Sequence, residues 1–183
     1  RTAGRSASVT RTRRPRARPR GACGVPDYRG VMSSTPTLRP VGASGMLVSA
    51  TGLGGNNFGR SGTRTETVDG TREVLDAALD AGVTFIDTAD IYGKEWGLSE
   101  TLLGEALRGR RDEFVVATKF GHGEIARSVP GGAKASRAAI RRNVEGSLRR
   151  LQTEWIDLYQ LHPPDPHTPI EETLDALGDL VRE

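Results

Sequence analysis

Three short apolar segments of this chain each end at an ionisable side chain, and this pattern constrains the fold more than any other feature. The segments, each with the residue that follows it, are 83–86 with Asp87, 114–118 with Lys119, and 155–161 with His162. β-branched and aromatic residues are frequent in runs that are too short for helices, so buried strands are predicted. The ionisable residues lie 32 and 43 positions apart. Each gap therefore has room for one crossover helix, as parallel strands require.

The ends of these strands are predicted to form one site. In a parallel β/α barrel the carboxyl ends of the strands meet at one face, where the chemistry takes place. Asp87, Lys119 and His162 would meet there, together with Tyr92 from the loop after the first of these strands. A buried carboxylate is costly unless it is paired, so Lys119 and His162 are the candidate partners of Asp87. Each residue alone is more often structural, but the four together indicate an enzyme.

Four motifs resemble those of the aldo-keto reductase family and occur in the family's order. They are Phe85–Gly93 (FIDTADIYG), Ser99–Gly104 (SETLLG), Ala117–Lys119 (ATK) and Leu161–Pro163 (LHP). The resemblance covers about residues 38–183 and implies a (β/α)8 barrel that reduces aldehydes or ketones to alcohols with NADPH. It also implies that Asp87, Tyr92, Lys119 and His162 are catalytic, and that Gly55, Asn56 and Asp87 lie at the cofactor.

The predicted fold is α/β: the first four βα units of a (β/α)8 barrel, preceded by a small hairpin over 38–48. A complete barrel typically needs about 250 residues, whereas this sequence has 183. The chain is therefore expected to be a fragment or a truncated product. The predicted elements are a first barrel strand over 48–53, a helix over about 67–81, helices that open at Ser99 and Ser136, and a last helix opened by the capping box Thr168-Pro169-Ile170-Glu171.

The positive charge of the chain comes from its first residues. Residues 1–40 hold ten arginines and one acid, although the whole chain has a net charge of only +3. Such a segment can bind nucleic acid or an anionic membrane nonspecifically. Its few large apolar residues instead favour a disordered extension over 1–37, with no specific nucleic-acid partner. Neither a signal peptide nor a membrane span is predicted, and the lone Cys23 favours a reducing cytoplasm.

The four candidate residues can divide the work of carbonyl reduction. Reduction leaves charge on the carbonyl oxygen, which must be protonated or stabilised. Tyr92 is the predicted proton donor, and the ammonium group of Lys119 favours its phenolate. Asp87 would hold Lys119, and His162 would donate a hydrogen bond to the substrate oxygen. Since no side chain supplies a hydride, a nicotinamide cofactor must do so.

Two other functions are compatible with the resemblance. One is a cofactor-sensing regulatory subunit, because potassium channel β subunits resemble the same family; they tend to differ at the histidine position, and His162 favours the enzyme. The other is an inactive fragment, because the family's 2′-phosphate contacts lie in a second half that this sequence lacks. Near the site, Trp96 is as consistent with simple packing as with lining an apolar pocket. His122 is expected to be a solvated loop residue, and the three histidines lack metal-ligand spacing.

Overall fold

The computed structural model describes residues 37–122 and 133–183, all within one compact unit, Ser33–Glu183. The predicted extension over 1–37 lies outside the described residues except for its last position. No helix in the described ranges is both long enough and apolar enough to span a membrane.

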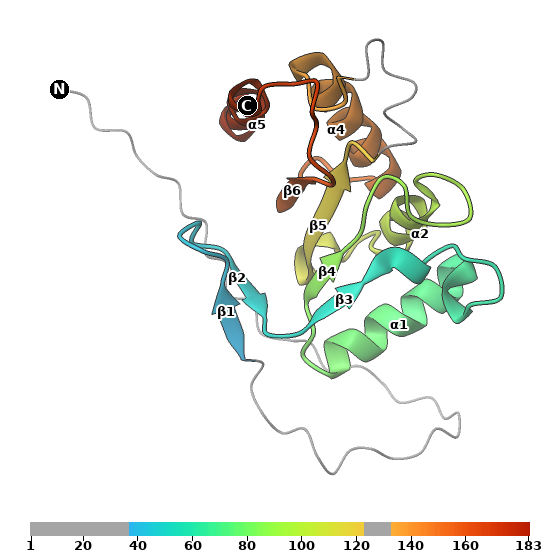
Figure 1. Ribbon diagram of the computed structural model, residues 1–183. Coiled ribbons are helices and arrows are strands. Elements are labelled where there is room, and N and C mark those ends of the chain that lie inside the picture. Colours follow the sequence, from blue (N-terminus) through green and yellow to red (C-terminus); the bar gives the residue numbers. More distant parts are fainter. Residues whose placement is uncertain (1–36, 123–132) are drawn as a thin grey trace, which may run out of the picture. The chain divides into compact units, whose positions relative to one another are not determined.

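A parallel sheet of four short strands forms the centre of the unit, in the order β3-β4-β5-β6 (Figure 1). The strands are β3 (Gly52–Gly54), β4 (Phe85–Asp87), β5 (Val115–Phe120) and β6 (Leu158–Leu161). Asp87 lies opposite Ala117 in the pairing of β4 with β5, and Lys119 lies opposite Gln160 in the pairing of β5 with β6. Sequence order therefore equals sheet order, which confirms the predicted partial barrel.

The predicted hairpin is also present, formed by the antiparallel strands β1 (Leu38–Pro40) and β2 (Leu47–Ser49). The predicted first barrel strand over 48–53 is wrong in its first half, because β2 belongs to the hairpin. The hydroxyl of Ser49 explains the boundary: it accepts hydrogen bonds from the amides of Thr84 (3.0 Å) and Phe85 (3.2 Å). The end of the hairpin is thereby fixed beside β4, and β3 begins only at Gly52.

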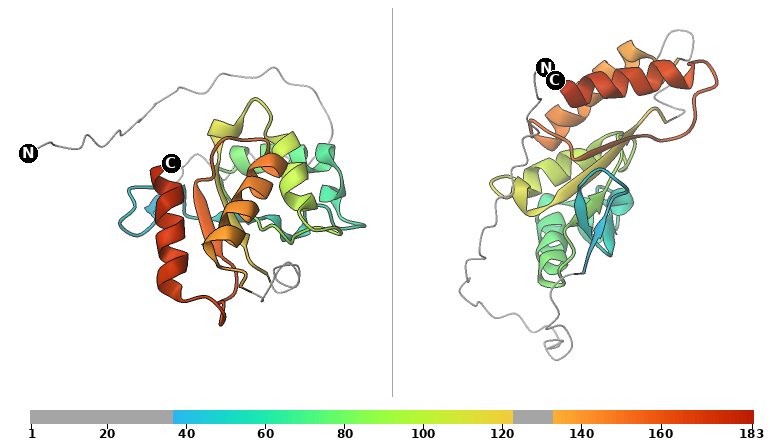
Figure 2. Two further views of the ribbon diagram at one scale, coloured as in Figure 1. Left: turned by 90° about the horizontal axis from the view of Figure 1, so that it is seen from above. Right: turned by 90° about the vertical axis from the view of Figure 1, so that its left-hand side faces the viewer.

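In residues 37–122 and 133–183, four helices follow the strands and pack in chain order, each against the next (Figures 1 and 2). Thr67 caps the first of them as its side chain accepts a hydrogen bond from the Gly70 amide at 3.2 Å. The helices are α1 (Val68–Asp80), α2 (Leu98–Ala106), α4 (Arg137–Leu151) and α5 (Ile170–Arg182), with 3-10 turns η1 (Gly55–Asn57), η2 (Arg64–Glu66) and η3 (Arg111–Glu113).

The predicted role of Ser99 as the N-cap of α2 is wrong. The helix begins at Leu98, and its N-cap is Gly97 in a left-handed conformation (φ 78°). The hydroxyl of Ser99 instead pairs with that of Thr88 at 2.8 Å and donates to the Gly55 carbonyl at 2.8 Å. Ser99 therefore joins α2 to the loops that follow β3 and β4.

The other two helix starts differ in outcome. Ser136 is the N-cap residue of α4, as predicted, although its side chain forms no capping hydrogen bond. The predicted capping box of the last helix is wrong. Pro169 is the N-cap of α5, and the hydroxyl of Thr168 donates to the Asp165 carboxylate at 2.7 Å. The hydroxyl of Thr168 is thus bonded to an aspartate three residues earlier and does not cap the helix.

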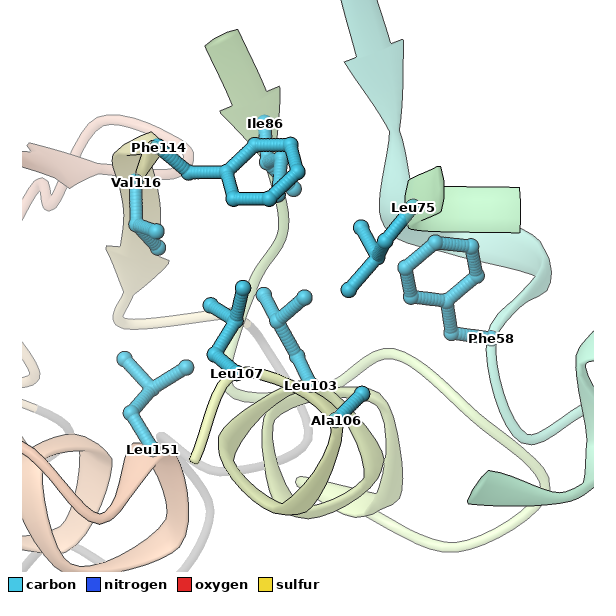
Figure 3. Close-up of a cluster of buried hydrophobic side chains, with 9 residues drawn as sticks. All are labelled: Phe58, Leu75, Ile86, Leu103, Ala106, Leu107, Phe114, Val116 and Leu151. Carbon is cyan, nitrogen blue, oxygen red and sulfur yellow. The ribbon is translucent and has the colours of Figure 1, made fainter. Parts of the chain in front are cut away.

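The larger core cluster fills the space between the sheet and helices α1, α2 and α4 (Figure 3). Ile86 of β4 and Val116 of β5 face this core, and both are fully buried. Side chains alternate along a strand, so Asp87 and Lys119 project from the opposite face, which none of the described helices covers. The cluster comprises Phe58, Leu75, Ile86, Leu103, Ala106, Leu107, Phe114, Val116 and Leu151.

Close packing of α2 on α4 depends on Gly104. A Cβ at this position would overlap the backbone carbonyls of α4, with the Leu151 oxygen at 2.7 Å. We expect Gly104→Ala to lower the free energy of unfolding by about 1 to 3 kcal/mol through overpacking, although alanine is the better helix former. Urea unfolding would measure the change.

Gly178 of α5 provides the matched control, because it is also a helical glycine. A Cβ there would meet only the end of the flexible Arg182 side chain, at 3.4 Å. Gly178→Ala should therefore stabilise the chain by up to about 1 kcal/mol. Equal shifts of the urea midpoint in the two variants would contradict the packing argument.

Candidate active site

Lys119 is the partner of Asp87. Its Nζ atom donates to the Asp87 carboxylate at 2.7 Å and to the Thr88 carbonyl at 2.8 Å. The lysine side chain is 15% exposed and the aspartate side chain 40%. The pair forms because β4 and β5 are adjacent and both side chains lie on the uncovered face near the carboxyl ends of their strands.

Tyr92 lies beside this pair. Its ring centroid is 5.2 Å from Lys119 Nζ, a cation–π distance. The loop is fixed by its own backbone, since the Tyr92 amide donates to Ala89 and the Tyr92 carbonyl accepts from Ser99. Gly93 has a φ of 113°, and a Cβ there would come within 2.8 Å of Leu98. A glycine is therefore needed directly after the tyrosine.

His162 completes the predicted group. Its ring contacts that of Tyr92 edge to face, with centroids 5.8 Å apart, and its amide donates to the Phe120 carbonyl at 2.9 Å. Burial lowers the pKa of His162, and the nearby Lys119 ammonium lowers it further. The imidazole is therefore neutral at neutral pH. Its Nδ1 atom is buried without a hydrogen-bond partner among the described residues, which leaves it available to a ligand.

His122 also lies at this site, which the sequence did not predict. It is a loop residue, as expected, but its side chain is half-buried, and its ring centroid lies 5.3 Å from that of His162. Its Nδ1 atom also lacks a partner among the described residues. The only sequence signal was its position three residues after Lys119. The site thus contains two imidazoles beside the Lys119 ammonium group.

Gly55 and Asn56, the predicted cofactor contacts, lie in η1. A Cβ at Gly55 would crowd the side chains of Thr88 (3.1 Å) and Ser99 (3.3 Å), so packing alone accounts for this glycine. The exposed side-chain oxygen of Asn56 accepts a hydrogen bond from Arg60 at 3.2 Å. No hydrogen bond or ring contact joins either residue to the four catalytic candidates within the described ranges. Their role at a cofactor stays a prediction.

A profile described as "Aldo/keto reductase family" matches residues 50–183. The chain belongs to this family. Aldo-keto reductase YhdN of Bacillus subtilis is 42% identical over 134 residues, which are 70% of this chain and 37% of the relative. The uncharacterized oxidoreductase YrpG of the same organism is 41% identical over 152 residues, or 78% of this chain and 44% of the relative.

Solved structures agree with this assignment. The holo form of aldo-keto reductase AKR11C1 from Bacillus halodurans superposes with a TM-score of 0.67 at 36% identity, covering 80% of this chain and 47% of that structure. The chain thus spans less than half the length of these three relatives.

In this aldo/keto reductase chain a second polar cluster lies on the helix side of the same strands. The carboxylate of Glu100, fully buried, accepts from the Thr118 hydroxyl at 2.6 Å and from Arg150 Nε at 2.7 Å. Gly97 gives the arginine room, since a Cβ there would come 2.5 Å from Arg150 Nε. The cluster ties β5 to α2 and α4 at the residue before Lys119. It thereby fixes the strand that carries the ammonium group.

Asp90, the second carboxylate of the FIDTADIYG motif, is buried beside this cluster and only 3% exposed. Neither carboxylate oxygen accepts a hydrogen bond of normal geometry from the described residues. Burial raises the pKa of Asp90 from its ordinary 3.8 to about 7, and the Glu100 carboxylate contributes to the rise. The Arg150 guanidinium and the Gly121 amide oppose it without cancelling it. Asp90 is therefore largely protonated in mildly acidic solution.

This burial predicts a pH-dependent stability. Between pH 3.8 and about 7 the folded chain binds one proton more at Asp90 than the unfolded chain does, so the free energy of unfolding falls as pH rises through this window. Asparagine cannot ionise, so Asp90→Asn should lack this fall. The free energy of unfolding of the variant, measured relative to that of wild type, should rise by about 3 kcal/mol from about pH 5 to pH 8. Urea unfolding at both pH values would measure this gain. The exposed Asp112→Asn serves as the control, and equal pH dependence of all three proteins would contradict the prediction.

Proposed function

We propose that this chain supplies the catalytic residues of an NADPH-dependent reductase that converts aldehydes or ketones into alcohols. The proposal rests on one observation above all: Lys119 Nζ lies 2.7 Å from Asp87 and 5.2 Å from the ring centroid of Tyr92, with His162 against that ring. The partner is a small carbonyl compound, and no specific nucleic acid is expected. A cytoplasmic location is part of the proposal, because Cys23 is the only cysteine.

Each side chain of the proposed tetrad has one task. Tyr92 donates a proton to the carbonyl oxygen as charge develops there. The ammonium of Lys119 stabilises the phenolate that remains, and Asp87 holds that ammonium in position. His162, neutral at neutral pH, donates a hydrogen bond that orients the carbonyl. NADPH, when bound, supplies the hydride.

The residues at the strand ends fit the nicotinamide end of such a cofactor. Gly54 lies opposite Asp87 in the pairing of β3 with β4, and a Cβ added at Gly54 would meet no atom within 4 Å. The surface beside Asp87 is therefore open to a flat group. Asp87 and the Asn56 amide would hold that group, with Gly55 shaping the adjacent turn. The preference for NADPH rests on the family resemblance, whose 2′-phosphate contacts belong to the second half of the barrel.

A chimaeric barrel tests the proposal, since this chain spans 37% of its Bacillus subtilis relative YhdN. Residues 50–183 would replace the matching segment of that relative, and loss of NADPH absorbance would be followed with a series of aldehydes and ketones. Turnover supports a reductase. NADPH binding without turnover on any carbonyl would instead support the regulatory function.

Lys119→Met in this chimaera should lower turnover by at least about 10²-fold, because the phenolate loses its nearby cation. Asp87 is 40% exposed, so water compensates much of the lost pairing. The free energy of unfolding should therefore fall by only about 1 kcal/mol. Steady-state kinetics and urea unfolding measure the two effects separately.

Lys94→Met is the matched control. Lys94 lies in the same loop as Tyr92, and its Nζ pairs weakly with Glu66 at 3.7 Å on the surface. Its substitution should leave turnover within about twofold of wild type. If Lys119→Met behaved like Lys94→Met, Lys119 would have no part in proton transfer.

A further inference from the structure

A hollow of about 280 Å³ lies on the helix side of the sheet, between the loop that joins β4 to α2 and the surface of α4. The candidate active site lies on the other face of the same strands. Six polar or aromatic side chains line the hollow: Asp90, Trp96, Arg142, Asn143, Arg149 and Arg150. Trp96 therefore lines a hollow, the alternative to simple packing, and the side chains around it are mainly charged or polar.

The positive charge of this hollow is only partly balanced. Arg150 is engaged by the buried Glu100 at 2.7 Å. Among the described residues, Arg149 forms an ion pair only with Glu145, at 3.9 Å, and both side chains are well exposed. Arg142 forms no ion pair with any residue in the described ranges. Two guanidinium groups are thus available to an anion, and their planar N–H groups suit phosphate oxygens.

Besides the arginines, two residues of the wall have buried polar atoms without a hydrogen-bond partner among the described residues. The Nδ2 atom of Asn143 is a buried donor without a partner in the described part of the chain. The two oxygens of Asp90 are also buried and accept no hydrogen bond of normal geometry from the described residues, and the residue is only 3% exposed. Buried polar groups are normally hydrogen-bonded, so a ligand in the hollow could supply the partners that these two groups lack. A hydroxyl group is a suitable partner for Asp90 in either protonation state, because it can donate to a carboxylate and accept from a carboxylic acid.

We propose that this hollow binds a small phosphate monoester that carries a hydroxyl group. The phosphate lies on Arg142 and Arg149 and accepts from Asn143, the hydroxyl pairs with Asp90, and the carbon skeleton packs on the ring of Trp96. A volume of about 280 Å³ is near the lower end for small-molecule sites, which favours a compact ligand over a dinucleotide. The site does not depend on the proposed reductase activity.

Trp96 offers a local readout, because the chain has only two tryptophans. With Trp155→Phe as background, Trp96 fluorescence would be titrated with glycerol 3-phosphate in the full 183-residue chain. A saturable change is expected. The double substitution Arg142→Ala, Arg149→Ala should raise the Kd at least about tenfold, since it removes two charge-assisted contacts. The arginine-rich segment at residues 1–40 is identical in all variants, so nonspecific anion binding there contributes equally and does not change the ratio of their Kd values.

Arg141→Ala is the matched control, since Arg141 neighbours Arg142 on α4 but pairs with Glu183 outside the hollow. It should leave the Kd unchanged. Arg142→Gln alone, at an exposed position without an ion pair in the described structure, should weaken binding several-fold even if the double variant fails to fold. A Kd unaffected by Arg142→Gln, or lowered affinity in Arg141→Ala equal to that in the double variant, overturns the site. Equal affinity for methyl phosphate, which has no alcohol hydroxyl, overturns the contact with Asp90.

Discussion

Tyr92→Phe in the chimaeric barrel is expected to lower the rate of carbonyl reduction by about 10² to 10⁴-fold, the range typical of a lost general acid. Phenylalanine keeps the ring that contacts Lys119 and His162 at 5.2 and 5.8 Å, so the surrounding geometry persists. Only the transferable proton is removed. The free energy of unfolding should therefore change by less than about 1 kcal/mol, as measured by urea unfolding beside the kinetic assay.

Tyr159→Phe is the matched control, since it removes another phenolic hydroxyl, from strand β6 of the sheet. Tyr159 stacks on Phe120 with centroids 4.7 Å apart, and its hydroxyl is buried without a partner among the described residues. Burial raises the pKa of Tyr159, and the Asp90 and Glu100 carboxylates add to the effect, so this phenol is a poor acid. Its loss should leave turnover nearly unchanged. If Tyr92→Phe kept more than half of the wild-type turnover, the proton donor would have to be sought elsewhere, first at His122.

The pairing of Asp87 with Lys119 could be predicted from the sequence because each residue directly follows a short apolar run. Such a run is a buried strand, so the charge lies at the strand's carboxyl end. Two such runs joined by one crossover then bring their charges to the same edge of a parallel sheet. Sheet order, strand pairing and the position of Tyr92 followed from this rule together with the family motifs.

The missed features lie where no period applies. The loop after β4 presents Tyr92 to one face of the sheet and Asp90 to the other, and no repeat in a loop indicates which side a residue takes. Ser99 fits the N-cap preference, but a hydrogen bond to Gly55, 44 residues earlier in sequence, determines its position. His122 was missed for the same reason, since its contact with His162 arises only when β5 and β6 pair.

The 183-residue chain produced by itself is expected to show no measurable carbonyl reduction, in contrast to the chimaeric barrel. The sheet has two edges in the described structure, β3 and β6, and unpaired strand edges favour association. The described helices leave uncovered the face that carries Asp87 and Lys119. The half-buried apolar residues Phe85, Val115 and Leu158 lie in the same strands and in the adjoining strand β6. In a closed barrel the opposite strands fill this interior.

The helix side behaves differently, and this separates folding from activity. The core between the sheet and α1, α2 and α4 is complete, with Leu75, Ile86 and Leu103 fully buried, so the chain should fold cooperatively. Helix α5 still exposes Leu174 (60%) and Val181 (88%), which adds apolar surface for association. Size-exclusion chromatography should therefore show oligomers with intact helical circular dichroism. Without opposite strands to bind the rest of NADPH, its binding energy cannot position the nicotinamide over Tyr92. A compact monomer with turnover equal to that of the chimaera would show that four strands suffice for catalysis, and would refute this expectation.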